Sequence, residues 1–319
     1  MPEQQGLYSP SNERHACGVG FVAHIKGQKS HKIVQQGLQI LANLTHRGAT
    51  GYDPKLGDGA GMLIQMPDAF MRKEAAKLSI NLPAAGEYAC GTAFLPQTKN
   101  GQEACESIIA RIIHEENQVL LGWRHVPRDN SNIAQAAKDV EPMMRQVFIG
   151  RGQVLADQNA IERRLFVIRK RIEHEVRALK LDDAAQFYFP SLSSKTIVYK
   201  GMLLANEVGV YYKDLNDADM VSALALVHQR FSTNTFPAWD LAHPFRMIAH
   251  NGEINTVQGN INWMTARHET MRSALLGEDL EKLWPLIVEG QSDSAAFDNA
   301  LELLVARSEE HTSELQSRG

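Results

Sequence analysis

The sequence has few cysteines, no long apolar run and no excess of one charge. Its three cysteines, Cys17, Cys90 and Cys105, are too few and too scattered for a disulfide framework or a zinc site, which fits a reducing, cytoplasmic compartment. The longest apolar runs, such as 223–227, are strand-sized, whereas a membrane helix needs about 20 apolar residues in succession. Lys and Arg number 33 against 37 Asp and Glu, and they are interspersed. Neither a nucleic acid nor a membrane surface is therefore indicated as a partner.

The two ends of the chain differ from the rest. Residues 1–16 contain no apolar segment, which argues against a secretion signal or a lipoprotein leader. Residues 308–319 lose the apolar periodicity that precedes them. The 319 residues, 44% of them hydrophobic, can bury a sizeable core as one large domain or two small ones. We predict a detachable propeptide at 1–16, one domain at 17–307 and a non-native tail at 308–319.

Strand-like runs occur in groups, with helical patterns inserted between the groups. Strands are predicted at residues 17–25, 62–65, 87–95, 118–123, 145–149, 187–199, 221–231 and 245–250, and helices at 31–44, 102–116 and 164–179. Because helices do not follow every strand, this order favours antiparallel sheets covered by helices, an α+β class, over a regular βαβ repeat.

Cys17 opens the first predicted strand and would become the first residue if the chain were cut after Ala16. A free α-amine has a reference pKa of roughly 7.7–8.0 and a thiol about 8.5, so near neutrality the amine can take up the thiol proton. While Ala16 remains attached, that nitrogen is an amide and cannot act as a base. The alternative interpretation is that Cys17 is a small buried hydrophobe. Gly18, Gly20 and Ala23 match a dinucleotide-binding spacing, but no strand precedes them, so we discard this match.

Three further stretches place polar side chains beside apolar runs. Arg230 ends a strand-like run and could grip a carboxylate, although such an arginine also suits a structural ion pair. Asn251 and Gly252 suit a tight turn, or could offer a side-chain amide and a backbone N–H to an oxyanion. Ser292 or Asp293 could cap the helix that follows, and Asp293 could instead bind an ammonium group.

Other polar residues have less specific patterns. Ser232 and Thr233 suit a turn or a helix cap. His228, His243 and His250 match no zinc spacing and have no cysteine nearby, so we predict no metal, and we predict that they either have structural roles or support the residues that contact a substrate.

Taken together and in this order, these stretches resemble the class II glutamine amidotransferases of the N-terminal-nucleophile superfamily and, among them, the large subunits of glutamate synthases. The resemblance covers residues 14 to 305. The stretches that carry it are Cys17–Phe21, Thr45–Ala49, Gly57–Gly61, Gly122–Arg124, Ser191–Gly201, Arg230–Pro237, Ala249–Asn255 and Ser292–Ser294.

The resemblance implies a four-layer αββα sandwich that hydrolyses L-glutamine to glutamate and ammonia. By that similarity Cys17 is the nucleophile, Arg230 holds the substrate α-carboxylate and Asp293 holds its α-ammonium group. Asn251 with Gly252 forms the oxyanion hole. The pocket would also be lined by Ser232, Thr233, Asn234 and Glu253.

The resemblance also implies what lies outside this domain. No cofactor or metal is expected in the domain itself. FMN and an iron–sulfur cluster belong to the remaining synthase domains of the family enzyme, where ammonia meets 2-oxoglutarate, and a small reductase subunit is a further expected partner. Two alternatives stay open: an amidotransferase domain serving another acceptor, such as a sugar phosphate, and an inactive truncated fragment.

Overall fold

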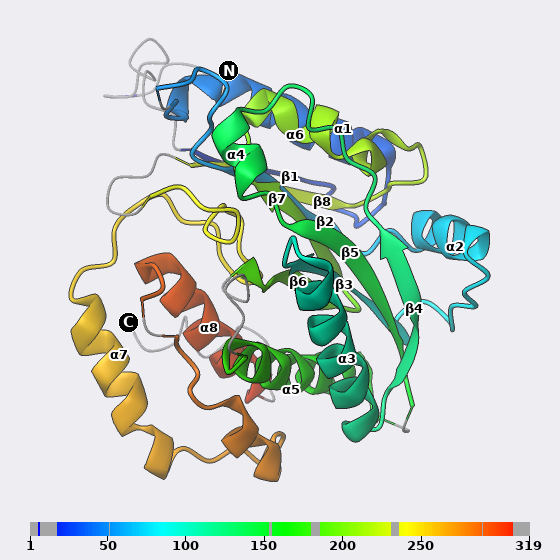
Figure 1. Cartoon of the computed structure of the whole chain (residues 1–319), viewed down its shortest axis with the longest axis vertical. Coiled ribbons are helices and arrows are strands. Elements are labelled where there is room, and N and C mark those ends of the chain that lie inside the picture. The colour runs from blue at the N-terminus through cyan, green and yellow to red at the C-terminus, as the bar shows by residue number, and fades with distance from the viewer. Residues whose placement is uncertain are drawn as a thin grey trace.

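The computed structural model describes residue 6 and residues 18–50, 52–152, 155–179, 186–230, 236–288 and 290–308. Within these ranges, two four-stranded antiparallel sheets lie between helices (Figure 1). The prediction of an α+β class built on antiparallel sheets is confirmed. None of the helices in the described ranges is both long and apolar enough to cross a membrane.

The first sheet contains the strand that follows Cys17. Its order is β1 (Val19–Ala23), β8 (Leu224–Gln229), β2 (Ala60–Gln65) and β7 (Thr196–Gly201). His228 near the end of β8 lies opposite Val19 of β1 and Gly61 of β2. The end of β8 is therefore held on both sides by neighbouring strands, and the residues after it start from a fixed position.

Helix α1 (His31–Asn43) covers the first sheet. Its buried residues Ile33, Val34 and Leu41 belong to the same hydrophobic cluster as Val227 of β8. These apolar residues recur at helical spacing, so one face of the helix meets the sheet while the other stays polar. Short helical segments follow β7 on the same side of the molecule, namely α6 (Val208–Tyr211) and the 3₁₀ turns 205–207 and 213–216.

The second sheet has one face toward the first sheet and one toward helices. Its order is β4 (Val119–His125), β5 (Met143–Gly150), β3 (Tyr88–Leu95) and β6 (Tyr188–Ser193). Along β3, Cys90 and Phe94 join the cluster shared with the first sheet, whereas Ala89 and Ala93 join a cluster with the helices. This alternation is the period of two that a strand buried on both faces requires. The covering helices are α3 (Lys99–Glu115) and α5 (Gln158–Arg177).

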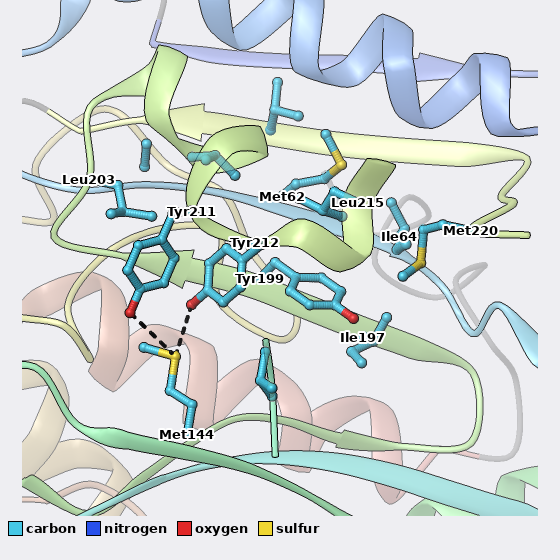
Figure 2. Packing of buried hydrophobic residues seen from close by; sticks show 14 of the residues in the cluster. Met62, Ile64, Met144, Ile197, Tyr199, Leu203, Tyr211, Tyr212, Leu215 and Met220 are labelled. Atoms are coloured by element: carbon cyan, nitrogen blue, oxygen red, sulfur yellow. Dashed lines mark hydrogen bonds between the residues drawn. The ribbon is translucent and has the colours of Figure 1, made fainter. Parts of the chain in front are cut away.

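Aromatic side chains fill the space next to β7 and reach the second sheet (Figure 2). Tyr199 of β7 and Tyr212 pack edge to face with their ring centres 5.1 Å apart. The hydroxyl of Tyr212 donates to the carbonyl of Lys200, 2.6 Å away, and lies 3.4 Å from the sulfur of Met144 on β5. Since the buried hydroxyl has a partner, this contact joins the two sheets without leaving an unpaired polar group.

Helix α8 (Asp293–Ala306) packs against α5 through a third cluster. This cluster contains Leu303 of α8, Phe166 of α5 and Leu283. A buried ion pair ties the same helix to the segment after β8, because Arg246 Nη2 lies 3.0 Å from Asp298 Oδ2. The helix is therefore fixed along its length by apolar and ionic contacts.

The structure corrects several predicted boundaries. The run 187–199 is two strands, β6 and β7, and two predicted helices begin earlier because Thr98 and Asp157 cap α3 and α5. The strand predicted at 245–250 is wrong. Its backbone bonds to side chains instead of a neighbouring strand, as the Met247 N–H does with Asp298 Oδ1 at 2.7 Å. The sequence pattern also gave no sign of α2 (Asp68–Lys77), α4 (Gln135–Asp139) and α7 (Val257–Ala266).

Candidate active site

A cavity of about 730 Å³ lies beside the end of β8. The predicted site residues that line it are Arg230, Asn251, Gly252, Glu253 and Asp293. We call these the five described site residues. They come from three separate stretches of the chain, so the fold brings together residues that the sequence keeps up to 63 positions apart (293 − 230).

Cys17, Ser232, Thr233 and Asn234 lie outside the described residues, and their predicted places stay predictions. The main chain next to Cys17 is described, however. A Cβ added at Gly18 would lie 3.0 Å from Asn251 Oδ1 and 2.4 Å from the carbonyl oxygen of Gln229. The backbone that follows Cys17 therefore lies against the Asn251 side chain, and only glycine fits there.

Arg230 is the first residue after β8, and its backbone N–H donates to the carbonyl of Gly59 over 2.7 Å. The residue is 8% exposed. Burial lowers the pKa of the guanidinium, while the negative charges of Asp58, Asp240 and Asp293 raise it. A partly desolvated guanidinium at the cavity wall is suited to binding a carboxylate, because both charges interact more strongly away from water.

Asn251 and Gly252 are exposed to the cavity, and we call them the 251–252 turn. The turn does not join two strands as a hairpin would. The residue before it is held by two buried histidines: His228 Nε2 donates to the His250 carbonyl over 2.9 Å, and the His250 N–H donates to His243 Nδ1 over 3.4 Å. The site thus combines exposed polar groups with a supported backbone.

Asp293 is the first residue of α8, and the preceding residue caps the helix. Ser292 Oγ accepts from the Ala295 N–H over 3.2 Å, so the capping prediction is confirmed for Ser292. Asp293 Oδ2 accepts from the Ile254 N–H over 2.7 Å, and Oδ1 accepts from the Ser294 N–H over 2.6 Å. The carboxylate therefore lies at the cavity wall in a fixed orientation, with capacity for further hydrogen bonds.

The histidines support the backbone and do not form a metal-ligand cluster. In the described part of the chain, no group of three or more His, Cys, Asp or Glu side chains is arranged to hold a metal ion. The His228 and His243 rings stack with their centres 4.4 Å apart. Burial lowers the pKa of both, that of His228 to about 4. Two neutral rings can stack closely without charge repulsion.

Acid should destabilise the folded chain through His228. The unfolded His pKa is about 6.5 and the folded pKa is about 4, so between these values only the unfolded chain binds the proton, and the free energy of unfolding falls as pH falls. From pH 7 to pH 5, His228 alone should contribute a loss of about 2 kcal/mol. Urea unfolding at both pH values should show a smaller loss for His228→Gln than for wild type. Equal losses would show that His228 is not held neutral by the fold.

The sequence prediction missed several residues of the cavity wall. His46, Arg47 and Gly48 line it, and a Cβ added at Gly48 would lie 2.4 Å from Gln229 Nε2. They fall within the Thr45–Ala49 stretch, which carried the family resemblance but suggested no chemical role. The wall is completed by Asn255, Thr256, Val257, Gln291, Ser292 and Ser294 together with His228, His243, His250 and Ile254.

A second, mainly apolar hollow of about 670 Å³ lies between α7 and α8. It shares His250, Ile254, Val257 and Asp293 with the first cavity. Trp263 on its wall is 70% exposed and Phe297 is 45% exposed. No signal in the sequence predicted this groove.

Comparison with known families agrees with the geometry. The model of the class-II glutamine amidotransferase family matches residues 17–316. The chain therefore belongs to the class-II glutamine amidotransferases.

Within this class, the chain is similar to glutamate synthases. It is 50% identical over 305 residues to the glutamate synthase (NADPH) large chain of Bacillus subtilis, an alignment that covers 96% of this chain and 20% of that protein. It is 46% identical over 311 residues to glutamate synthase (NADH) of Schizosaccharomyces pombe, with 96% and 14% covered. It is 39% identical over 306 residues to the ferredoxin-dependent glutamate synthase of Pyropia yezoensis, with 96% and 20% covered. The chain thus spans a fifth or less of the length of these relatives.

Proposed function

We propose that this chain hydrolyses L-glutamine to glutamate and ammonia, with Cys17 as nucleophile after removal of residues 1–16. The observation that carries the proposal is the single cavity lined by all five described site residues. The closeness of Gly18 to Asn251 adds to it, because Gly18 follows Cys17 in the chain and a Cβ added at Gly18 would lie 3.0 Å from Asn251 Oδ1. The family match also begins at residue 17.

Two opposite charges suit the two ends of the amino-acid substrate. Arg230 would bind the α-carboxylate through its guanidinium fork, and Asp293 would bind the α-ammonium group. Arg230 and Asp293 line the same cavity, and the negative charge of Asp293 raises the pKa of Arg230. Glu253 lines the cavity, and Ser232, Thr233 and Asn234 come two to four residues after Arg230 in the chain. We assign these four residues to the pocket wall.

The chemistry we propose is acyl transfer through a thioester. The α-amine of Cys17 takes the thiol proton while Sγ attacks the carboxamide carbon, and the carbonyl oxygen becomes an oxyanion. The Asn251 side-chain amide and the Gly252 N–H donate to that oxyanion. The C–N bond then breaks as the proton passes to the leaving nitrogen. Water attacks the thioester, releasing glutamate and restoring the thiol.

The fold supports the same assignment. An N-terminal-nucleophile hydrolase of the αββα type needs two stacked sheets between helices and a nucleophile at the start of a strand. Here two antiparallel sheets lie between helices, and β1, which begins at Val19, two residues after Cys17, is an edge strand of the first sheet in the described residues. It pairs with β8, which leads into Arg230, so the same sheet would position both the nucleophile and the group that binds substrate.

We further propose that the ammonia serves glutamate synthesis in the cytoplasm, as part of a longer glutamate synthase. The similarity to glutamate synthases supports this acceptor over others. FMN, an iron–sulfur cluster and a small reductase subunit would then belong with the remaining synthase domains. The two cysteines that the structure describes, Cys90 on β3 and Cys105 on α3, do not fit an iron–sulfur cluster, because they are fully buried in two different hydrophobic clusters. No step proposed for this chain uses either cofactor.

The test compares two forms of the chain, one that keeps Ala16 attached and one that begins at Cys17. Intact mass establishes the N-terminus of each. We expect the form with a free Cys17 to release ammonia and glutamate from glutamine in equal amounts, and the form with the leader to release neither, because an amide nitrogen cannot accept the thiol proton. A folded chain that begins at Cys17 and binds glutamine, yet releases no ammonia, would overturn the proposal.

A further inference from the structure

Side chains, and not a neighbouring strand, hold the 251–252 turn in place. On its N-terminal side, the Met247 N–H donates to Asp298 Oδ1 over 2.7 Å. On its C-terminal side, the Ile254 N–H donates to Asp293 Oδ2 over 2.7 Å. Both carboxylates belong to α8, so one helix fixes the segment at two points around the turn.

His250, the residue just before the turn, is held at both of its backbone groups. Its carbonyl accepts from His228 Nε2 over 2.9 Å, and its N–H donates to His243 Nδ1 over 3.4 Å. Because a carbonyl can only accept, the proton of His228 must sit on Nε2. Because His243 Nδ1 accepts, the proton of that ring sits on its other nitrogen. The two rings are 1% and 5% exposed, so water does not compete for these bonds.

The His250 carbonyl matters because of its place in the chain. It belongs to the planar peptide group that leads into Asn251. A hydrogen bond that fixes this carbonyl also fixes the plane of the peptide group between His250 and Asn251. It therefore sets the direction in which the main chain continues into Asn251 and Gly252. Both turn residues are themselves exposed, so their orientation depends on the backbone contacts on either side.

We propose that His228 is a positioning residue for glutamine hydrolysis, because its ring N–H fixes the peptide before the 251–252 turn. This inference rests on the proposed function. Oxyanion donors are effective when they already point at the place where charge develops. A misplacement of about 1 Å can lower the rate about 10²-fold. His228 therefore acts on the rate through the turn.

The sharpest test uses two amides in place of the ring. In His228→Gln the amide nitrogen lies near the position of Nε2 and can still donate to the His250 carbonyl. In His228→Asn it lies near the position of Nδ1, too far away to donate. His228 Nδ1 makes no hydrogen bond within the described residues, so neither variant removes a second bond of the ring. His174→Asn is the matched control, because His174 on α5 also bonds a backbone carbonyl, with its Nε2 2.9 Å from the Pro285 carbonyl oxygen, and neither residue lines the cavity.

The measurement is kcat and KM for ammonia release by chains that begin at Cys17. The active fraction of each is titrated with 6-diazo-5-oxo-L-norleucine, a glutamine analogue that alkylates a nucleophilic cysteine. We expect His228→Asn to lower kcat per active site by about 10- to 100-fold with KM nearly unchanged, because the turn acts in the transition state. His228→Gln should restore most of the rate, and His174→Asn should change neither constant.

A double variant separates positioning from general damage. Asn251→Ala alone should lower kcat by about 10²–10³-fold, the usual effect of losing one oxyanion donor. Adding His228→Asn to it should then lower kcat by clearly less than it does in wild type, because one of the two positioned donors is already gone. Equal rates for the Gln and Asn variants, or a full additional loss in the Asn251→Ala background, would overturn the role of His228. Absence of ammonia release from wild type would instead overturn the proposed function, and this role with it.

Discussion

Replacing Cys17 with alanine should reduce kcat for ammonia release by a factor on the order of 10⁶ in a chain that begins at residue 17. No other cysteine can take its place. Cys90 and Cys105 are fully buried, and burial raises the pKa of the Cys90 thiol to about 12, so it stays protonated near neutrality. The measurement is glutamine-dependent ammonia release, with intact mass confirming the N-terminus.

Cys105→Ala provides the matched control. It removes a thiol from α3, on the far side of the second sheet from β1, and should leave kcat unchanged even if it lowers the free energy of unfolding. The Cys17→Ala chain should still bind glutamine, which a rise in melting temperature with added glutamine would show. Wild-type rates in Cys17→Ala would mean that the hydrolysis comes from another nucleophile or a contaminant.

The sequence predicted many of the helices and strands, whose backbone hydrogen bonds lie within one helix or between paired strands. The strands around Cys90, Val147 and Val227 have the alternating or wholly apolar pattern of buried strands, and the structure contains them. The helix at 31–44 matches α1 to within one residue. Helix starts were placed late at 102 and 164 because the caps, Thr98 and Asp157, precede the apolar repeat that signals a helix.

The segment 245–250 shows why other features could not be predicted. Its mainly apolar run is typical of a strand, yet backbone groups of the segment bond to the side chains of Asp298, His243 and His228. Asp298 lies 51 residues from Met247 in the chain, and the ionic contact with Arg246 is buried. No local pattern encodes such a pairing, because it exists only once α8 has packed beside the segment.

The candidate site was predictable to a similar degree. Residues with recognisable chemistry, such as Arg230, Asn251 and Asp293, were found from their place after apolar runs and from family resemblance, and one cavity now gathers them. His228 was predicted either to be structural or to support the residues that contact the substrate, but not which of these, since its role depends on which carbonyl its ring meets. Gly48 belonged to a stretch that carried the resemblance but suggested no role, because its importance is the space it leaves for Gln229.

Helix α8 contributes both to the packing of the hydrophobic core and to the candidate active site. Asp293 lies at its first residue and faces the cavity, while Leu303 near its other end packs against α5. Because the Ile254 N–H also bonds Asp293, a change at this carboxylate affects both the proposed ammonium contact and the 251–252 turn. Substrate binding and oxyanion stabilisation therefore share one structural support, whereas Arg230 depends on β8 and offers a cleaner probe of binding alone.

Replacing Arg230 with methionine should lower kcat/KM for glutamine about 10²–10³-fold, mainly through KM. The α-carboxylate is remote from the reacting carbon, so its contact is equally strong in the ground state and the transition state, and its loss weakens binding without slowing chemistry. Removal of the guanidinium also leaves Asp58, Asp240 and Asp293 to repel the substrate carboxylate. Arg230→Lys keeps the positive charge but cannot form two parallel hydrogen bonds to a carboxylate. Its kcat/KM should therefore lie between those of wild type and Arg230→Met. Steady-state ammonia release over a wide range of glutamine concentrations measures both constants.

A substrate without the α-carboxylate tests the proposed contact between Arg230 and that group. In 4-aminobutanamide the carboxamide and the amine are kept and the α-carboxylate is absent, so wild type should hydrolyse it poorly and Arg230→Met should do so almost equally well. Arg128→Met removes the same charge from an ion pair with Glu141 away from the cavity wall, and should leave KM for glutamine unchanged. If Arg230→Met lost as much activity on 4-aminobutanamide as on glutamine, the arginine would be holding the fold of the cavity and not the substrate carboxylate.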